Sequence, residues 1–507
     1  MIEIFPAKKE LQKTISNSTN KYVIPIWCEI IADLETPVSA YYKVCKDKKY
    51  SFLLESVEGG ESVGRYSFIG FDPLYILKSD LEETSIFNTL NKDTLMKADN
   101  PYDLLEKFLS SYSSVNYDIP YSPGVVGYFS YDTIRHIEPT LNKEFNKIEE
   151  CHSFPEAYFM IAGSILAFDH VKHKIYVIVN ALTDNKSDID KIYESSQVKI
   201  ESILSQLTVS HNLSPLNLAL EDTHQEISSN ISKEEWINAI NAAKEHIKAG
   251  DIFQAVLSQR FCVERNNVEP FTIYRALRSI NPSPYLYYLD FNDFKIIGSS
   301  PEIMVKCSSD RIAEIRPIAG TRKRGKTQEQ DLLLEEELLN DPKERAEHIM
   351  LVDLGRNDLG KVCEYGSVKV NRLMAVEKFS HVQHIVSDVT GKLREDLSSV
   401  DLIKACFPAG TVSGAPKVRA MEIIYNLERS ARGPYAGCIG CFGFNNEVNT
   451  AITIRTMLVR DNKVFIQAGA GIVADSDPEL EYQETQNKAA ALVQALSRLA
   501  SEKCSKV

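Results

Sequence analysis

The chain has 507 residues, a length that suits two large domains or three smaller ones. Its hydrophobic content of 44% and charged content of 25% are those of an ordinary globular protein, and its net charge of −13 argues against a broad nucleic-acid or membrane-surface role. The start of the chain lacks the pattern of a signal peptide, no apolar run is long enough to span a bilayer, and the cysteines are scattered, so we expect a protein of the reducing cytoplasm.

Residues 1–206 are predicted to form an N-terminal region that mixes strands and turns. Its clearest strand is His173–Asn180, which is rich in β-branched and aromatic residues, and a helical pattern follows over about 186–205. Residues 207–231 are polar and weakly periodic, a composition that predicts a linker.

Residues 232–507 are predicted to alternate between helices and grouped strands. Ser232 opens a capping box for an amphipathic helix that runs through Lys248 and is closed by Gly250. Strands grouped as hairpins between helices predict an α+β fold with large, mostly antiparallel β-sheets packed with helices. The expected strands lie near 252–264, 284–306, 436–444, 448–459 and 463–468, and the expected helices near 328–352, 399–406 and 478–501.

Two of these helices begin in the same way. Asp341-Pro342 and Asp477-Pro478 each place a capping aspartate before a proline at the first helical position. Each helix then carries two glutamates three residues apart, and hence on one face. For a single pair, a solvated helix face is the more frequent explanation, but the duplication favours a meeting of the two faces. The four carboxylates would then need a cation, and oxygen-only ligands with an anionic substrate favour Mg²⁺. The glutamates are Glu344, Glu347, Glu481 and Glu484.

Residues Gly320–Thr327 match the phosphate-loop pattern GxxxxGK[ST]. A P-loop nucleotide hydrolase is therefore the alternative from a different class. The preceding segment Arg311–Ile318 argues against it, because this segment alternates polar and apolar residues and contains a proline, whereas a phosphate loop follows a buried parallel strand.

A series of further motifs resembles the chorismate-utilising enzymes. The resemblance is strong over about 232–500 and reaches the N-terminal region through Leu53–Ser56. It implies an Mg²⁺-dependent enzyme with an N-terminal regulatory region at 1–206 and a chorismate-binding catalytic region at 232–507. The motifs occur in the family's order as Gly298–Glu302, Pro317–Thr321, Glu347–Asp358, His384–Ser387, Phe407–Lys417 and Gln467–Ile472.

The resemblance also implies roles for single residues. Glu347 and Glu484 would bind the metal directly, and the other two glutamates directly or through water. Glu302 would be the general acid for the leaving hydroxyl, with a pKa raised by the acidic cluster, and His384 would take a ring proton as pyruvate leaves. The remaining implied residues are Thr411 in the catalytic set and Gly320, Thr321, Tyr435, Arg455, Gly469, Ala470, Gly471 and Lys488 in substrate binding.

Two of these substrate contacts have a physical basis of their own. The stretch from Gly469 to Gly471 is nearly free of side chains, so it can offer backbone N–H groups. Lys488 can supply a point charge for a carboxylate, but it also lies four residues after Glu484, where an ordinary helix ion pair is the alternative.

Two alanines separate the branches of the family. Water-using relatives carry a lysine at the position of Ala255, and aminodeoxychorismate-forming relatives typically carry one at the position of Ala319. Both absences point to the branch that converts chorismate and ammonia to anthranilate and pyruvate, the first committed step of tryptophan biosynthesis. The aminodeoxychorismate-forming branch is the alternative.

The resemblance further implies two partners. The chain lacks a glutaminase signature, so a separate glutamine amidotransferase subunit is expected to supply ammonia. L-Tryptophan is expected as a feedback inhibitor, although a strand and a turn with core aromatics would explain the same motifs. The tryptophan site would be lined by Ser56, Pro284, Tyr285 and Leu286.

Overall fold

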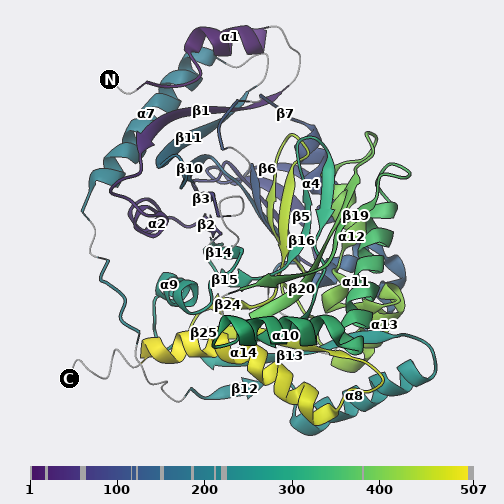
Figure 1. Ribbon diagram of the computed structural model, residues 1–507. Coiled ribbons are helices and arrows are strands. Elements are labelled where there is room, and N and C mark those ends of the chain that lie inside the picture. The colour runs from purple at the N-terminus through teal and green to yellow at the C-terminus, as the bar shows by residue number, and fades with distance from the viewer. Residues whose placement is uncertain are drawn as a thin grey trace.

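The computed structural model describes residues 3–16, 21–56, 64–115, 117–120, 124–148, 154–183, 188–210, 213–218, 225–379 and 382–500. Two large sheets form its frame (Figure 1). Apart from the short parallel pair β1–β7, every described pairing is antiparallel, which confirms the predicted α+β class.

The first sheet has 13 strands. In spatial order they are β12 (Ile227–Ser229), β13 (Gln254–Glu264), β25 (Lys463–Ile472), β24 (Thr456–Arg460), β15 (Lys295–Ser300), β14 (Tyr285–Asp290), β2 (Ser51–Glu55), β3 (Tyr66–Phe71), β10 (Ser164–Asp169), β11 (Lys174–Thr183), β1 (Tyr22–Ile31) and β7 (Ser113–Ser114), with β21 (Gly414–Ala415) beside β13.

The second sheet has 12 strands. Their order is β18 (Ile318–Lys323), β20 (Val382–Lys392), β17 (Ile312–Ile315), β16 (Ile303–Cys307), β23 (Val448–Ile452), β22 (Cys438–Phe442), β8 (Val125–Phe129), β9 (Ala157–Ile161), β4 (Tyr75–Ser79), β5 (Thr84–Asn88) and β6 (Thr94–Ala98), with β19 (Lys369–Lys378) beside β20.

Helices pack on the sheets and fill the ends of the frame (Figure 1). They are α1 (Lys8–Ser16), α2 (Pro37–Cys45), α4 (Pro101–Ser110), α5 (Ile134–Ile137), α6 (Asn142–Phe145), α7 (Ile189–Thr208), α8 (Lys233–Lys248), α9 (Pro270–Ile280), α10 (Gln328–Asn340), α11 (Pro342–Gly360), α12 (Ser399–Cys406), α13 (Lys417–Glu428) and α14 (Pro478–Ala500), with short 3₁₀ turns η1 (Tyr131–Thr133), η2 (Pro139–Leu141) and η3 (Gly410–Val412).

Apolar faces explain this layering. Phe52 of the first sheet and Val126 of the second belong to one buried cluster, so the sheets share a core. A second cluster joins the first sheet to α2, α7, α9 and α14, and a third joins the second sheet to α4, α11, α12 and α13. Burial of these side chains is the main driving force that holds the layers together.

The N-terminal and C-terminal regions contribute strands to both sheets. Glu55 of β2 pairs with Leu286 of β14 in the first sheet, and Phe129 of β8 pairs with Cys438 of β22 in the second. The predicted division around residues 207–231 therefore does not coincide with a division of the sheets, and it stays a prediction about function. Residues 211–212 and 219–224 of the predicted linker lie outside the described residues.

Local signals located several elements well. The capping box of Ser232 and Glu235 opens α8, which ends at Lys248 as predicted, before Gly250 at φ +81°. The helix predicted near 328–352 is two helices, because Asp341 ends α10 and caps α11. Helices α9 and α13 and strands β19 and β20 were not predicted.

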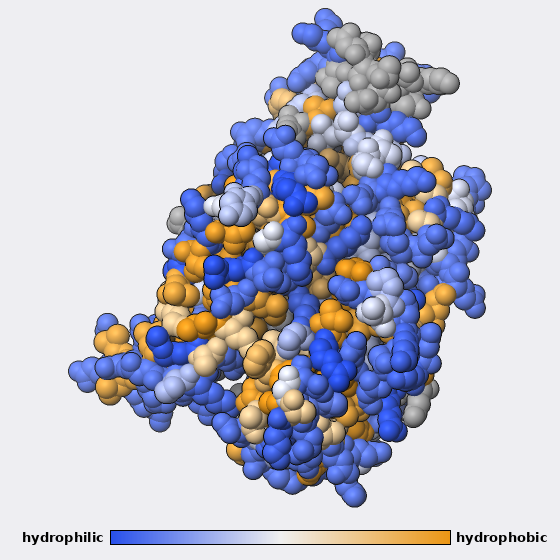
Figure 2. Space-filling view, turned by 90° about the vertical axis from the view of Figure 1, so that its right-hand side faces the viewer, coloured by the Kyte–Doolittle hydropathy of each residue, from blue (hydrophilic) through white to orange (hydrophobic). Residues whose placement is uncertain are grey.

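The surface matches the composition. On the face shown in Figure 2, hydrophilic residues predominate and hydrophobic residues lie in separate patches among them. Among the described residues, no helix combines the length and the apolar character needed to cross a membrane.

Candidate active site

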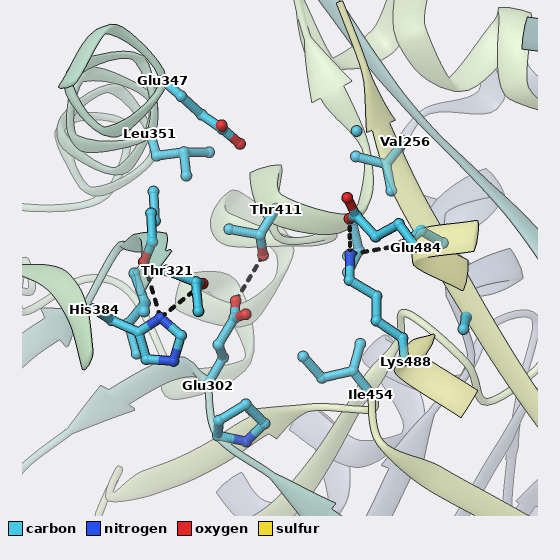
Figure 3. A pocket seen from close by; sticks show the side chains of 18 of the residues that line it. Val256, Glu302, Thr321, Glu347, Leu351, His384, Thr411, Ile454, Glu484 and Lys488 are labelled. Atoms are coloured by element: carbon cyan, nitrogen blue, oxygen red, sulfur yellow. Dashed lines mark hydrogen bonds and ion pairs between the residues drawn. The ribbon is translucent and has the colours of Figure 1, made fainter. Parts of the chain in front are cut away.

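A cavity of about 560 Å³ lies where strands β13, β18, β20 and β25 meet helices α11 and α14. It collects almost all of the residues predicted for catalysis, substrate binding and metal binding from distant parts of the chain (Figure 3). These are Glu302, Gly320, Thr321, Glu344, Glu347, His384, Thr411, Tyr435, Arg455, Gly469, Gly471, Glu481, Glu484 and Lys488.

The two Asp-Pro sequences begin the two helices that carry the glutamates. Asp341 Oδ1 accepts hydrogen bonds from the backbone N–H groups of Lys343 and Glu344, at 2.9 and 3.2 Å. Asp477 Oδ1 does the same at the start of α14, at 2.9 and 3.1 Å. The predicted capping is therefore confirmed, and Figure 3 shows Glu347 and Glu484 approaching the cavity from different sides.

The sequence had suggested that the four carboxylates converge on one point. In the structure they share the cavity but do not converge. Among the described residues, no group of three or more acidic, histidine or cysteine side chains is close enough to hold a metal ion as it stands. Two of the glutamates instead pair with cations: Glu344 Oε1 lies 3.1 Å from an Arg322 nitrogen, and Glu484 Oε1 lies 2.6 Å from Lys488 Nζ.

The other two glutamates, Glu347 and Glu481, have raised pKa values, as expected for buried carboxylates that lie near one another. Burial, and then the neighbouring Glu344, raise the pKa of Glu347. Burial also raises the pKa of Glu481, with a further contribution from Glu484. Carboxylates that repel one another around a polar cavity, with oxygen donors only, fit a hard divalent cation that keeps some of its water.

Glu302 follows β15 and is held by a threonine from η3. Its Oε2 accepts a hydrogen bond from Thr411 Oγ1 at 2.9 Å. Burial raises the pKa of Glu302, whereas the Thr411 hydroxyl and the cations Lys488 and Arg455 lower it. The sequence analysis attributed the shift to the acidic cluster. This was wrong as to the main cause, since Glu347 makes only a minor contribution.

His384 lies in β20 opposite Thr321 of β18. Its Nδ1 is 2.9 Å from the carbonyl oxygen of Gly320 and 3.1 Å from Thr321 Oγ1. A carbonyl oxygen can only accept, so Nδ1 carries the proton and Nε2 keeps its lone pair. Burial lowers the pKa of His384, so the ring is a neutral base at pH 7.

Gly320 is required by two features of its position. It lies at an irregularity between Ala319 and Thr321 in the pairing of β18 with β20, and its φ of +70° is unfavourable for other residues. A Cβ at this position would also lie only 3.0 Å from Glu344 Oε2. The glycine therefore lets Glu344 approach the strand.

Alternation along β25 decides which of its backbone groups face the cavity. The N–H groups of Val256 and Ser258 in β13 donate away from β25, to Ser413 and Glu428. Their partners Gly471 and Gly469 are therefore non-hydrogen-bonded pairs, whose N–H groups point to the opposite side. Beyond Ile466, where the pairing with β24 ends, this edge of β25 pairs with no other described strand.

Ala470 does not share this position, contrary to the sequence analysis. It lies between the two glycines, so its backbone faces Leu257 of β13, and its side chain is buried in the core beside α8 and α13. A strand alternates with period two, and three consecutive residues therefore cannot all offer their N–H groups to one side.

A buried ion pair supports the cavity wall. Arg432 donates to the carbonyl oxygens of Val256 and Val412 at 2.6 and 2.7 Å and to Glu428 at 2.6 Å. Its guanidinium lies 5.8 Å from the centre of the Tyr435 ring. Arg432 therefore ties together three segments that line the cavity.

Replacing Arg432 with methionine is expected to lower the free energy of unfolding by about 3–5 kcal/mol, because Glu428 would keep a buried, unpaired charge. Urea unfolding followed by circular dichroism measures the effect. Arg419→Met is the matched control: its ion pairs with Asp251 and Glu422 are more exposed, and their loss should cost less than about 1 kcal/mol. Equal losses in the two variants would contradict the assignment.

The match to a phosphate loop has a different explanation. Residues Ile318–Lys323 form β18, which pairs antiparallel with β20. The N–H groups of Gly325 and Lys326 are bonded to the side chains of Asp331 and Gln330 at 2.5 and 2.9 Å. The loop therefore binds the first turn of α10, and the context of a P-loop nucleotide hydrolase is absent from this part of the described chain.

The sequence analysis missed several polar residues at or beside the cavity. Gln254 and Lys343 line the cavity, and Arg322 contacts Glu344. Each is next to or near a motif residue in the sequence, but alternation and helix phase alone could not show which neighbours face inward.

The predicted tryptophan motifs meet in the first sheet. Glu55 pairs with Leu286, which brings Ser56 beside Tyr285 at the ends of β2 and β14. The side chains of Tyr285 and Leu286 pack in different clusters on opposite faces of the sheet. One ligand could contact both residues only through the backbone at this strand end, and tryptophan binding stays a prediction.

Comparison with known proteins agrees with this geometry. The family model of the chorismate binding enzymes matches residues 49–494. Anthranilate synthase component 1 of Synechocystis is 49% identical over 498 residues, covering 94% of this chain and 96% of the relative. The protein of that name from Acetivibrio thermocellus is 47% identical over 480 residues, covering 94% and 95%.

Solved structures share the fold. The crystal structure of anthranilate synthase component I from Streptococcus pneumoniae has a TM-score of 0.75 and 37% identity, covering 92% of this chain and 99% of that one. The menaquinone-specific isochorismate synthase of Escherichia coli has a TM-score of 0.70 at 20% identity, covering 97% and 99%, a likeness of fold alone.

The fold, the cavity and the family match define a chorismate-binding enzyme. Within that family, the chain belongs to the anthranilate synthase component 1 group, which converts chorismate to anthranilate.

Proposed function

We propose that this chain forms anthranilate and pyruvate from chorismate and ammonia in the cavity between α11 and α14, with Mg²⁺ as the cofactor. Chorismate contains no nitrogen, so the amino group of anthranilate needs a separate donor. The observation that carries the proposal is the placement of an acid, Glu302, and a neutral base, His384, in one cavity with four metal-suited carboxylates.

The metal would be held by Glu347 and Glu484, with Glu344 and Glu481 as further or water-mediated ligands. When bound, Mg²⁺ supplies Lewis-acid chemistry: it neutralises the ring carboxylate and draws electron density from the ring. All other steps in the proposal belong to the protein's own side chains.

Glu302 gives its proton to the ring hydroxyl, which leaves as water while the ammonia nitrogen forms its bond to the ring. The raised pKa keeps Glu302 protonated closer to neutral pH. Thr411 fixes the carboxyl group through its hydrogen bond. Ammonia attacks through its own lone pair, so this step needs no activating base.

His384 then removes a ring proton through Nε2. The electron pair makes the ring aromatic as the carbon–oxygen bond to the enolpyruvyl group breaks, and the leaving enolate takes up a proton to become pyruvate. The bond from Nδ1 to Gly320 holds the ring in the tautomer that this step requires.

The second carboxylate of chorismate would be bound by the remaining polar groups of the cavity. Arg455 offers a fork, Tyr435 a hydroxyl and Lys488 a point charge, and Gly469 and Gly471 offer N–H groups.

The two alanines support amination with release of the aromatic product. Ala319 lines the cavity with a methyl group that cannot form a covalent intermediate. Ala255 is fully buried in the core beside α8 and α13, so this position supplies no base for water.

Three further parts of the proposal concern the setting of the reaction. A glutamine amidotransferase subunit supplies ammonia, as the name "component 1" of the relatives suggests. L-Tryptophan binds near Ser56. Tyr285 of the same motif pairs with Ser300, which lies two residues before Glu302, so the tryptophan site and the active site share the strand pair β14–β15. The described cysteines are free thiols, in keeping with a cytoplasmic location.

The test is fluorescence-detected anthranilate formation by the purified chain with chorismate, MgCl₂ and ammonium chloride at alkaline pH. We expect product that requires the metal, is abolished by EDTA and is lost in Glu484→Gln. Lys326→Met, in the loop that resembles a phosphate loop, should retain full activity. Aminodeoxychorismate or isochorismate as the product would contradict the assigned reaction.

A further inference from the structure

Two of the four cavity glutamates are already neutralised by basic side chains. Arg322 Nη1 of β18 lies 3.1 Å from Oε1 of Glu344 on α11, and within α14 Lys488 Nζ lies 2.6 Å from Glu484 Oε1. The other glutamate of each helix has neutral partners instead, Gln254 for Glu347 and Ser476 for Glu481. Each helix therefore presents one carboxylate that is paired with a cation and one that is not.

Both cations also have partners that do not belong to the metal site. Arg322 donates to Glu337 at 2.8 Å and to Asp341 at 2.8 Å, so it keeps two carboxylates if Glu344 moves away. Lys488 keeps the carbonyl oxygen of Gly469 at 2.8 Å. Each cation therefore keeps a partner when its glutamate moves away, so the exchange of the glutamate for another partner costs little free energy.

We propose that Arg322 and Lys488 are exchangeable counter-ions, which compete with the divalent cation for Glu344 and Glu484. This inference rests on the proposed function. When Glu484 turns to the metal, the ammonium of Lys488 becomes available for a carboxylate of the substrate. Metal and substrate then promote each other's binding, and by linkage the effect is the same in both directions.

Arg322 could instead be a positioning residue that holds Glu344 ready for the metal. The two roles predict changes of opposite sign. If Arg322 competes, its removal tightens metal binding; if it positions the carboxylate, its removal weakens metal binding. Metal affinity without substrate therefore decides between them.

The experiment is isothermal titration of the substrate-free full chain with MgCl₂. In Arg322→Met, we expect the Kd for Mg²⁺ to fall about three- to tenfold, the change expected from the loss of a mostly buried ion pair. A Kd that is unchanged or higher would overturn the proposal. Wild-type protein that binds no Mg²⁺ would instead contradict the metal part of the proposed function.

Lys343→Met is the matched control for a general charge effect. Lys343 lines the same cavity and lowers the pKa values of Glu347 and Glu481, but within the described chain it makes no ion pair with the four glutamates. We expect a smaller gain in affinity than in Arg322→Met. An equal gain would mean that net charge alone sets the affinity, and it would overturn the exchange.

Arg322→Gln removes the charge but keeps hydrogen-bond donors, and it serves if the methionine variant does not fold. A lower Kd for Mg²⁺ than in wild type supports the exchange, and an unchanged Kd overturns it. In ammonia-free buffer, Mg²⁺ should also tighten chorismate binding to wild type more than to Lys488→Met. Equal tightening in both would show that Lys488 does not couple the two ligands.

Discussion

Glu302→Gln is expected to lower kcat about a thousandfold, because the amide cannot give a proton to the leaving hydroxyl. The KM for chorismate should change little, since glutamine has nearly the same shape and can still bond to Thr411. Anthranilate fluorescence measures both constants. Glu314→Gln, on the neighbouring β17, is a half-buried control that does not line the cavity, and it should leave kcat unchanged. Wild-type kcat in Glu302→Gln would show that another group protonates the hydroxyl.

The same carboxyl group sets the alkaline side of the pH profile. Glu302 must be protonated to act, so kcat should fall as pH rises through its pKa, which burial has raised. The Thr411 hydroxyl lowers that pKa. Thr411→Val should therefore raise the pKa further and move the alkaline limb to higher pH. A shift to lower pH would contradict this assignment.

The sequence was most informative where local chemistry determines structure. Asp341 and Asp477 each predicted a helix that begins with a capping aspartate and a proline, and both helices begin there. The phase of each helix then placed its glutamate pair on one face, and both faces line the cavity. These inferences need only spacing and capping, which act within one turn.

Long-range pairing was beyond the sequence. Arg322 belongs to a stretch that reads as a phosphate loop, and nothing local shows that its fork reaches Glu344 on the next helix but one. The division near residues 207–231 looks like a boundary, yet β2 and β14 pair across it. Ala470 was misplaced because its backbone faces Leu257 of β13, a strand partner that the sequence does not show.

The state of Glu302 shows a similar limit. The sequence revealed nearby carboxylates, and they suggested repulsion as the cause of its raised pKa. Burial is the main cause of the raised pKa, because Glu302 lies in the wall of the cavity. Two cations partly offset this shift. Burial is a property of the assembled fold, so composition and motif spacing do not report it.

His384→Gln is expected to lower the rate of anthranilate formation about a thousandfold while the addition of ammonia continues. Glutamine can keep a bond to the Gly320 carbonyl but cannot accept the ring proton. The variant should therefore release an aminated, non-aromatic product that retains the enolpyruvyl group. Mass spectrometry of the products, with chorismate consumption measured in parallel, identifies it.

Thr321→Val tests whether the Thr321 hydroxyl is needed for His384 to act as the base. It removes one contact of Nδ1 but leaves the bond to the Gly320 carbonyl, which fixes the tautomer, so anthranilate should remain the product. Burial lowers the pKa of His384, so the base stays neutral, and the lyase step active, at pH values below the usual imidazole range. If His384→Gln also stopped chorismate consumption, the histidine would be needed before amination. The division of labour between Glu302 and His384 would then be wrong.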